Sequence, residues 1–464
     1  MKPHILALVF ASFFFSLSAQ DGPVQALKKQ AKENSGFLRD MGTLWADVKQ
    51  GTSQDYAYLD GLYKHLHTHP ELSFHETETA RRMAAELQQA GFEVTEGVGG
   101  NGVVGVLKNG EGPTVLVRAD MDALPITEQT GKTYASTVTT VDGQGNTVGV
   151  MHACGHDVHM SVWVGAARRL ATLKGQWKGT LLFIGQPAEE RSGGAKAMLA
   201  DGLYKRFPLP DYALALHVSP SLPAGQTGLH AGYSLANVDM MDITVFGMGG
   251  HGAYPHTAKD PIVLAARIVL ALQTIVSREI SPLEPAVVTV GSIHGGSKGN
   301  IIPDEVKLEL TMRSYSDKVR QAIIDKIERI CRGEAMAAGL PENRYPTFKL
   351  RDEYTPSVYN DPALTARLEQ VFTQMFGKEQ VVEASPSMAG EDFARYGRTE
   401  HKIPICLFWL GAVDPVLYEA VQRGEASLPA LHSAQFAPLP EPTIKTGVQA
   451  MTAAVLSLLN HGIK

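Results

Sequence analysis

The stretch TLLFIGQPAEE, residues 180–190, begins as a continuous apolar run and ends in two adjacent acids, Glu189 and Glu190. A short apolar run without alternating polar side chains is typical of a β-strand that is buried on both faces. An adjacent pair of acids usually lies in a solvated turn. Here the pair comes directly after the predicted strand and Pro187, which favours a functional role for both carboxylates.

Two other runs have the same form, and together the three runs set the expected fold. Thr114–Val117 leads into Asp120 and Asp122, and Tyr212–Leu216 leads into His217. Strands that are buried on both faces predict a mostly parallel sheet covered by helices. Ligands bind to such sheets beyond the carboxyl ends of the strands. Because all three runs end in side chains that can bind metal, the sequence predicts a metal site at that edge.

The stretch MHACGHDVH, residues 151–159, holds Cys154 and His156 on either side of a glycine, which lets the backbone turn sharply. Thiolate and imidazole both bind zinc, and carboxylates extend the range of metals toward manganese. By itself, the stretch is equally compatible with a buried cysteine beside a helix-capping histidine and aspartate. Ligands elsewhere in the chain decide between these interpretations.

Five side chains form the predicted ligand set of two adjacent divalent metal ions: Cys154, His156, Glu190, His217 and His432. Glu189, which would not bind metal, is predicted to take a proton from the attacking water and pass it to the leaving nitrogen. Asp120 and Asp122 could bind metal, orient a ligand imidazole or form a salt link to Arg118. We favour the orienting role for both.

Three further residues are candidates for contact with the substrate. His251 lies in a glycine-rich loop and is predicted to donate a hydrogen bond to the developing oxyanion. Asn300 and Arg313 are candidates to bind a substrate carboxylate, and structural roles are equally open for both. These three assignments depend on positions that only the fold can supply.

A histidine-rich stretch ends the helix predicted over Leu59–Pro70. His65, His67 and His69 alternate there and could serve as ligands. Such a helix end is more often ordinary surface or a place where side chains pair with the helix terminus. We therefore interpret all three as residues without a catalytic role.

The chain has 464 residues, which is more than a single hydrophobic core usually holds. Its pattern of apolar and polar residues changes near Val238. From there to residue 350 the pattern predicts strand, helix, strand, strand, helix and a last short strand, a small α+β unit inserted into the metal-bearing part. The predicted order is a signal peptide at 1–19, a catalytic domain at 20–237, the inserted domain at 238–350 and the rest of the catalytic domain at 351–464.

The net charge limits the classes of binding partner that we expect, and the first residues predict the cellular compartment. The formal net charge of −6 gives no basic surface for nucleic acid. Lys2, the apolar run Ile5–Leu17 and the small residues Ser18 and Ala19 predict a cleaved signal peptide, with no membrane span after it and no cysteine for a lipid anchor. We expect a periplasmic or secreted protein. Its three cysteines make no disulfide framework, and a metal would explain a free thiol in an exported chain.

Eight short motifs follow one another from about Tyr56 to the end of the chain: HTHPELSFHE (67–76), RADMDALP (118–125), MHACGHD (151–157), GQPAEE (185–190), GGHGAYPH (249–256), NIIPDE (300–305), GEDFA (390–394) and LHSAQF (431–436). In this order they resemble the metal-dependent amidohydrolases of the aminoacylase and carboxypeptidase G superfamily. The resemblance is closest to the branch of bacterial N-acyl-amino-acid hydrolases and plant auxin-conjugate hydrolases. Any one motif alone would be weak, whereas the series is highly specific.

The resemblance implies an α/β fold: an αβα-sandwich catalytic domain with a mostly parallel sheet, interrupted by an inserted α+β lid domain through which subunits dimerise. It implies the same five metal ligands, Glu189 as general base and acid, and His251 as the lid histidine that reaches the active site of the partner subunit. The implied cofactors are two divalent metal ions: manganese, zinc or cobalt. The expected activity is hydrolysis of the amide bond of N-acyl amino acids or similar small conjugates by a homodimer.

The chain departs from the family pattern around the pocket. Gly252 and Tyr254 replace the small and apolar residues common after the lid histidine, Gly390 stands where serine is frequent, and no proline follows Ser433. The segment 135–148 is also longer than usual and is expected to form an extra loop. These differences concern the substrate and leave the chemistry of the ligands unaffected.

Three alternatives stay open. A dipeptidase or carboxypeptidase would use the same metal chemistry on another substrate. A metal-binding protein without catalysis would have no need of Glu189 beside Glu190. A cysteine hydrolase built on Cys154 and His156 would leave the predicted ligands on the other segments unexplained.

Overall fold

The computed structural model describes residues 42–141, 145–352 and 354–460. The predicted signal peptide, residues 1–19, lies outside these residues. The sheets and the site described below belong to one compact unit, Trp45–Lys464.

The central sheet has eight strands. In spatial order they are β1 (Glu93–Val98), β2 (Gly102–Asn109), β6 (Gly179–Gln186), β3 (Thr114–Asp120), β7 (Tyr212–Pro223), β18 (Ile405–Val413), β8 (Thr227–Leu229) and β17 (Val381–Glu383). The four middle strands β6, β3, β7 and β18 run parallel, whereas β1 and β2 pair antiparallel at one edge. The three apolar runs that the sequence singled out are therefore three adjacent parallel strands.

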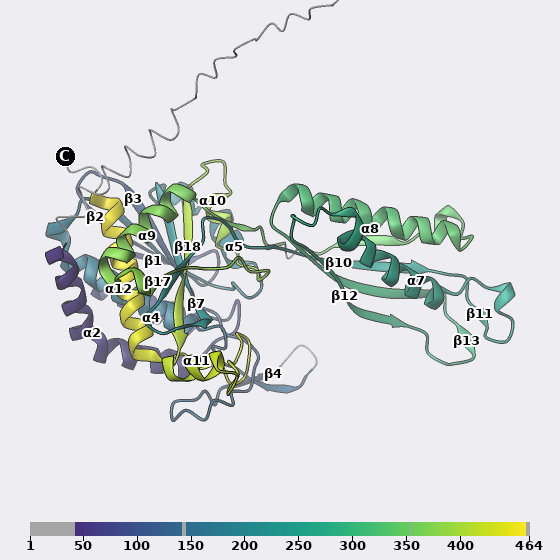
Figure 1. The fold of residues 1–464 in the computed structure, drawn as a ribbon, viewed down its shortest axis with the longest axis horizontal. Coiled ribbons are helices and arrows are strands. Elements are labelled where there is room, and N and C mark those ends of the chain that lie inside the picture. Colours follow the sequence, from purple (N-terminus) through teal and green to yellow (C-terminus); the bar gives the residue numbers. More distant parts are fainter. Residues whose placement is uncertain (1–41, 142–144, 353, 461–464) are drawn as a thin grey trace, which may run out of the picture. The chain divides into compact units, whose positions relative to one another are not determined.

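Helices cover both faces of this sheet (Figure 1). One face carries α3 (Thr77–Gln89), α4 (His156–Thr172), α9 (Pro362–Phe376) and α12 (Pro440–Leu459), and the other carries α5 (Gly194–Ala200), α6 (Leu203–Arg206) and α10 (Ala394–Gly397). Alternate residues of β6 serve the two layers: Phe183 packs against Trp163 of α4, while Leu182 belongs to the cluster that includes Met198 of α5. The predicted αβα sandwich is confirmed.

A second sheet follows β9 (Gly232–Leu235). Its strands are β12 (Ala286–Gly295), β14 (Glu305–Ser314), β10 (Asn237–Phe246) and β15 (Thr347–Leu350), all paired antiparallel. Helices α7 (Pro261–Thr274) and α8 (Asp317–Ala337) pack on it around a core of their own that includes Ile268, Leu308 and Ile327. We call this sheet with its two helices the lid unit. The predicted domain boundaries at 237/238 and 350/351 stay a prediction.

Side-chain caps fix where the lid helices begin. Asp260 accepts a hydrogen bond from the backbone N–H of Ile262 at 2.8 Å, and Pro261 occupies the first turn of α7. Ser316 accepts from the N–H of Val319 at 3.2 Å at the start of α8. By length and composition alone, one described helical stretch, Pro261–Glu279, could span a membrane.

The remaining α-helices and strands of the described residues are α2 (Gly42–Thr68), β4 (Thr139–Val141), β5 (Thr147–Gly149), β11 (Gly250–His251), β13 (Ile301–Ile302), β16 (Val358–Asn360) and α11 (Pro415–Gln422). Strands β4 and β5, which lie largely within the segment that the sequence marked as longer than usual, pair antiparallel.

Candidate metal centre and active site

The predicted metal ligands come from separate elements that meet at one edge of the central sheet. The loop after β6 carries Glu190, and β7 carries His217. Helix α4 begins at His156, with Cys154 just before it, and His432 lies in the loop before α12. This is the edge where the parallel strands have their carboxyl ends, the usual place for a ligand in such folds.

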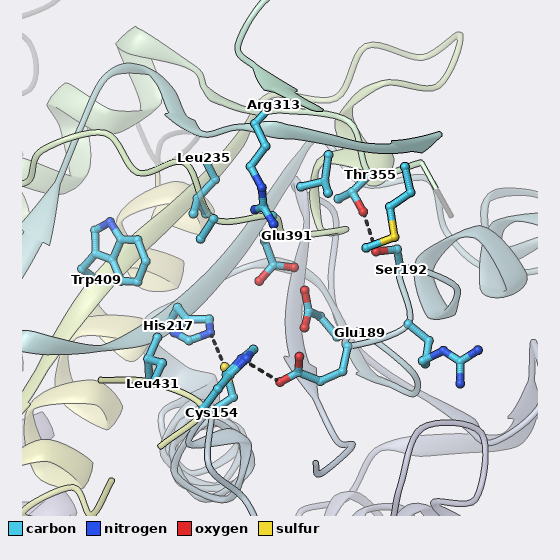
Figure 2. Close-up of a pocket in the computed structure, with 17 residues that line it drawn as sticks. Cys154, Glu189, Ser192, His217, Leu235, Arg313, Thr355, Glu391, Trp409 and Leu431 are labelled. Carbon is cyan, nitrogen blue, oxygen red and sulfur yellow. Dashed lines mark hydrogen bonds and ion pairs between the residues drawn. The ribbon is translucent and has the colours of Figure 1, made fainter. Parts of the chain in front are cut away.

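Short distances join the ligand atoms of these five residues (Figure 2). Cys154 Sγ lies 3.4 Å from His217 Nε2. Glu190 Oε1 lies 3.4 Å from His432 Nε2 and 3.9 Å from His156 Nε2. The five residues belong to overlapping groups whose donor atoms lie within 4.8 Å of one another. The structure thus brings the whole predicted ligand set together, and the metal-binding role of each residue stays a prediction.

Backbone carbonyls set the tautomers of two of the histidines. His156 Nδ1 donates to Asp122 O at 2.7 Å, and His217 Nδ1 donates to Val218 O at 2.9 Å. In its neutral form, which is the form that binds metal, each ring therefore has its lone pair on Nε2, the atom that faces the other ligands. Among the described residues, the buried atoms His156 Nε2 and Glu190 Oε1 have no hydrogen-bond partner. The donor set and these two unpartnered atoms fit a bound divalent metal ion.

The environment of Cys154 bears on the alternative of a cysteine hydrolase. Burial raises the pKa of its thiol well above the usual range, and the carboxylates of Glu190 and Glu189 raise it further. A neutral thiol is a poor nucleophile, so this site does not activate Cys154 for attack. A metal ion would instead bind the thiolate and release the thiol proton.

His159 lies among the ligands, but both of its ring nitrogens are engaged. Its Nδ1 donates to Asp120 Oδ1 at 2.6 Å, and its Nε2 accepts the N–H of Val218 at 2.9 Å. Asp120 also accepts a hydrogen bond from Arg118 at 2.6 Å. Asp120 therefore forms the salt link that the sequence left open, and the imidazole that it orients is that of His159, which is outside the predicted ligand set.

Two buried carboxylates hold the turn that carries the acid pair. Asp122 accepts the backbone N–H of Glu189 at 3.1 Å through one oxygen and that of Glu190 at 3.0 Å through the other. Glu76 accepts the N–H of Ala188 at 2.7 Å, where the backbone has a positive φ of 48°. Sequence reasoning missed Glu76. The Asp122 carboxylate also lies 3.5 Å from His156 Nδ1, which is the kind of imidazole contact that the sequence predicted. Asp122 and Glu76 both position the acids through the backbone.

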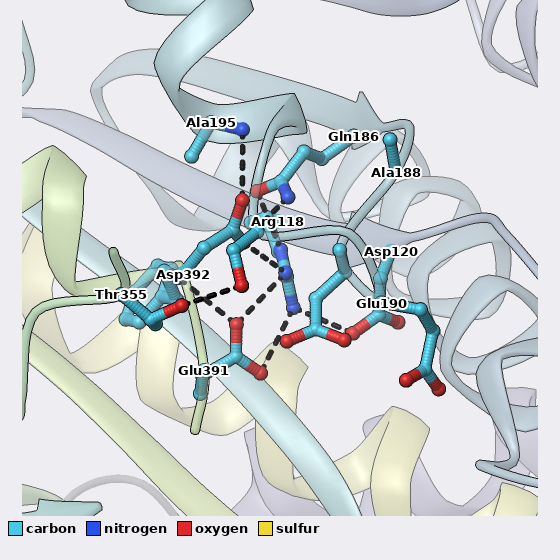
Figure 3. A network of polar contacts seen from close by, with 12 residues as sticks. Arg118, Asp120, Gln186, Ala188, Glu190, Ala195, Thr355, Glu391 and Asp392 are labelled. Atoms are coloured by element: carbon cyan, nitrogen blue, oxygen red, sulfur yellow. Dashed lines mark hydrogen bonds and ion pairs between the residues drawn. The ribbon is translucent and has the colours of Figure 1, made fainter. Parts of the chain in front are cut away.

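A carboxylate oxygen of Glu189 lies within 4.8 Å of oxygens of Glu391 and Asp392. Those two residues belong to a buried charge network centred on Arg118 (Figure 3). Arg118 donates to Glu391 at 2.9 Å and to Asp392 at 3.2 Å, in addition to Asp120. Burial raises the pKa of Glu189 well above its usual range, and the charge of Glu391 raises it further. A carboxyl group that binds a proton this readily can act as base in one step and as acid in the next.

A pocket of about 570 Å³ opens at this edge of the sheet. Its lining includes Cys154, Glu189, Glu190, His217 and His432. Arg313, on β14 of the lid unit, lines the same pocket and donates to Met388 O at 2.7 Å. Among the described residues, its guanidinium has no acidic partner, and burial lowers its pKa. A half-buried cation that lines a cavity and has no acidic side chain in direct contact is suited to an anionic ligand.

The other two predicted substrate residues lie elsewhere. His251 is on β11, exposed, and accepts the N–H of Ala253 at 3.0 Å. Asn300 lies beside it, because its carbonyl accepts the N–H of Gly252 at 2.9 Å. Neither residue is among those that line the pocket of its own chain, as far as the described residues show. Their predicted roles are untested by this geometry.

The interpretation of His67 as ordinary surface or as a side chain that pairs with the helix terminus is wrong. Its side chain is 2% exposed. Nδ1 lies 2.6 Å from Asp157, and Nε2 lies 3.1 Å from both carboxylate oxygens of Glu128. Burial by itself would lower the pKa of His67, but the hydrogen bonds to the two carboxylates raise it to about 10. The ring is therefore a cation at neutral pH. For His69, the predicted pairing with the helix terminus is confirmed, because its Nδ1 lies 2.8 Å from the backbone carbonyl of His65 at the helix end.

The two carboxylates that His67 contacts belong to segments that carry metal ligands or touch them. Asp157 directly follows His156. Gln129, next to Glu128, donates its N–H to the carbonyl of Ala434 at 2.8 Å, two residues beyond His432. His67 thus links the segment that carries His156 to the segment that contacts the loop of His432.

Replacement of His67 by glutamine should lower both stability and metal affinity. The variant leaves two buried carboxylates without a cation, which typically lowers the free energy of unfolding by about 3–5 kcal/mol. Loss of a residue that supports metal ligands typically weakens metal binding about 10–100-fold.

The contribution of His67 to the free energy of unfolding should also depend on pH, because its pKa is raised to about 10 in the folded state. This contribution is complete below about pH 6.5, the pKa of histidine in the unfolded chain, and is lost progressively as the pH rises through about 10. Thermal denaturation across pH and metal titration measure these effects. The matched control is His65→Gln on the same helix; equal effects of the two changes would contradict the argument.

Comparisons with known proteins place these observations in a family. Residues 116–431 match the model of peptidase family M20/M25/M40. The N-acetylcysteine deacetylase of Bacillus subtilis is 36% identical over 355 residues, which cover 76% of this chain and 88% of the relative. Thermostable carboxypeptidase 1 of Saccharolobus solfataricus is 36% identical over 354 residues, which cover 75% of this chain and 84% of the relative.

A solved structure shows the same fold. The dinuclear metal binding peptidase of Bacillus subtilis superposes with a TM-score of 0.69 at 30% sequence identity, covering 88% of this chain and 99% of that chain. The range that matches the family model contains every predicted ligand except His432.

Proposed function

Since the chain belongs to peptidase family M20/M25/M40 and is therefore a metal-dependent hydrolase of amide or peptide bonds, we propose that its substrates are N-acyl amino acids or similar small conjugates. The observation that carries this proposal is Arg313. Its guanidinium, which has no direct acidic partner among the described residues, lines the same pocket as Glu189 and most of the predicted ligands. An N-acyl amino acid offers a carboxylate to that cation and an amide bond to the acid pair. The name of the N-acetylcysteine deacetylase supports the same substrate class.

The proposed mechanism assigns a separate role to each group of residues in the site. Cys154, His156, Glu190, His217 and His432 would hold two divalent ions, and manganese, zinc and cobalt all suit this donor set. Such ions supply Lewis acidity, which polarises an amide carbonyl and lowers the pKa of water. Glu189 takes the proton of the attacking water and delivers it to the leaving nitrogen. Arg313 holds the carboxylate of the departing amino acid, and His251 donates to the oxygen on which negative charge develops.

Hydrolysis of a substrate panel tests the proposal. The protein is stripped of metal, reconstituted with manganese, zinc or cobalt, and given N-acetyl, N-benzoyl and longer N-acyl amino acids beside plain dipeptides. Metal-dependent release from the acylated amino acids is the expected result. Cleavage of dipeptides alone would support the second candidate, a metallo-dipeptidase or carboxypeptidase, which the similarity to thermostable carboxypeptidase 1 favours. Stoichiometric metal binding without any turnover would support a binding protein.

Arg313→Gln should raise KM for an N-acyl amino acid about 10–100-fold and change kcat less, because a hydrogen bond to a charged group contributes about 1.5–3 kcal/mol. The matched substrate is the amide of the same N-acyl amino acid, which lacks the carboxylate. Wild-type protein should prefer the acid, and the variant should lose that preference. Arg313→Lys should restore part of it. An unchanged ratio of the two substrates in Arg313→Gln would remove this residue from carboxylate binding.

The proposed homodimer forms through the lid unit. Val263 and Leu270 lie two turns apart on α7 and are 58% and 72% exposed, and Leu283 beyond the helix is 91% exposed. Exposed large apolar side chains on one helix, such as Val263 and Leu270, support a protein interface on this part of the lid unit. Leu270→Glu should shift the mass in light scattering from dimer to monomer.

Export is proposed from the sequence of the first residues alone. Lys2, the apolar run Ile5–Leu17 and the small residues Ser18 and Ala19 support a cleaved signal peptide. Fractionation of cells that express the full chain, with N-terminal sequencing of the product, tests cleavage near Gln20 and a periplasmic or secreted location. A full-length protein in the cytoplasm would contradict the proposal.

A further inference from the structure

One wall of the pocket is apolar and lies directly beside the metal ligands. Trp409 on β18 is the register partner of His217 on the neighbouring parallel strand, so both side chains project from the same face of the sheet. Their rings meet edge to face with centroids 5.5 Å apart. Trp409 and His217 both line the pocket. A group bound next to His217 on this side therefore contacts the indole.

Two leucines extend this wall. Leu431 precedes the predicted ligand His432, and Leu235 ends β9. Both line the pocket, and Trp409 and Leu235 also share one hydrophobic cluster. We call Trp409, Leu431 and Leu235 the apolar wall.

Two residues of the apolar wall lie across the ligands from Glu189. In Figure 2, Trp409 and Leu431 lie to the left of His217 and Cys154 and Glu189 lies to their right, whereas Arg313 reaches in from above, beside Leu235. Under the proposed function, Glu189 protonates the leaving nitrogen and Arg313 binds the carboxylate of the same leaving group. The amino-acid half of the substrate is thereby assigned to the part of the pocket beside Glu189 and Arg313.

The amide carbon joins the two halves of the substrate, so the acyl half must extend away from Glu189. On the side of His217 that is away from Glu189, the pocket is bordered by the apolar wall. We infer that this wall is the acyl-binding subsite and that it selects an acyl group larger than acetyl, namely an aryl or medium-length alkanoyl group. This inference rests on the proposed function. An acetyl group would leave most of the wall uncovered, whereas each further methylene that is buried favours binding about fourfold.

The test compares acyl groups on one amino acid. With metal-loaded wild-type protein, kcat/KM for N-octanoyl or N-phenylacetyl substrate should exceed that for the N-acetyl substrate by about 100-fold or more, since several methylenes are buried. Trp409→Ala should reduce this ratio at least about tenfold, and Trp409→Phe should keep most of it. The matched control is Tyr359→Ala, an exposed aromatic side chain that does not line this pocket among the residues described. It should leave the ratio unchanged.

A binding measurement separates the subsite from the proposed function. Octanoate and acetate, the free acids that acyl cleavage would release, are titrated into the metal-loaded protein by calorimetry. Octanoate should bind at least about tenfold more tightly, and Trp409→Ala should remove the difference. If N-acyl amino acids are cleaved with no preference among acyl groups, the subsite is refuted while the proposed function stands. If none is cleaved but octanoate is preferred, the proposed function fails and the apolar subsite stands.

Discussion

Glu189→Gln is expected to reduce kcat on N-acyl amino acids by about 10²–10⁴-fold, the usual contribution of a general acid–base residue, while the metal content stays that of the wild type. Glutamine keeps the size and the hydrogen-bonding oxygen of the side chain but cannot carry the proton. Metal should be retained because Glu189 is outside the predicted ligand set, and the adjacent Glu190 is held independently by Asp122 through its backbone N–H at 3.0 Å. Steady-state kinetics and metal analysis of the same preparation measure both quantities.

Two controls sharpen this experiment. Glu189→Asp keeps the carboxylate but withdraws it by one methylene, so its activity should fall between those of the wild type and the glutamine variant. Glu190→Gln should instead lose metal, because the predicted role of that carboxylate is coordination. Wild-type turnover in Glu189→Gln would remove this residue from the mechanism.

His251→Ala is expected to lower kcat about 10²–10³-fold, as loss of one oxyanion donor does, with little change in metal content. The side chain is exposed on β11 and does not line the pocket described for its own chain. A role in catalysis therefore needs a second subunit, and this requirement yields a test by mixing. In a dimer that combines a Glu189→Gln chain with a His251→Ala chain, one active site carries both changes and the other carries neither.

Reassociation of the two inactive variants should thus restore activity. The mixed dimer has one intact site, so it should recover about half of the wild-type activity per dimer. The control is a mixture of the same variants in the Leu270→Glu background, where dimers should not form and activity should stay low. Restored activity in that background, or none in the original mixture, would contradict a histidine donated by the partner subunit.

The parts of the fold that the sequence predicted share a simple physical basis. Thr114–Val117, Thr180–Ile184 and Tyr212–Leu216 are apolar without alternation, and such runs can only be strands with two buried faces or buried helices. Polar side chains that follow such strands must gather at one sheet edge. The gathering of Cys154, Glu190 and their partners was therefore predictable from residue chemistry and strand direction alone.

The supports of the site were not predictable in this way. His67 pairs with Asp157, 90 residues along the chain, and Glu76 holds Ala188, 112 residues along. No local pattern encodes such pairings, because they depend on how distant segments dock. One signal was available for His67: it follows Tyr63 by four residues, on the buried face of its helix. Helical spacing, applied to the histidines as well as to the apolar residues, would have set it apart from His65 and His69.

The charge network of Arg118 constrains the order in which a nascent chain can fold. Arg118 and Glu391 are 273 residues apart, and the whole lid unit is synthesised between them. Until the segment with Glu391 and Asp392 docks, Arg118 lacks two of the three carboxylates that contact it among the described residues and keeps only Asp120, which disfavours closure of the core. Nearly the entire chain must therefore be synthesised before this network and the central sheet are complete, because β18 also follows residue 390. A chain truncated before residue 390 is expected to be cut by proteases faster than the full chain.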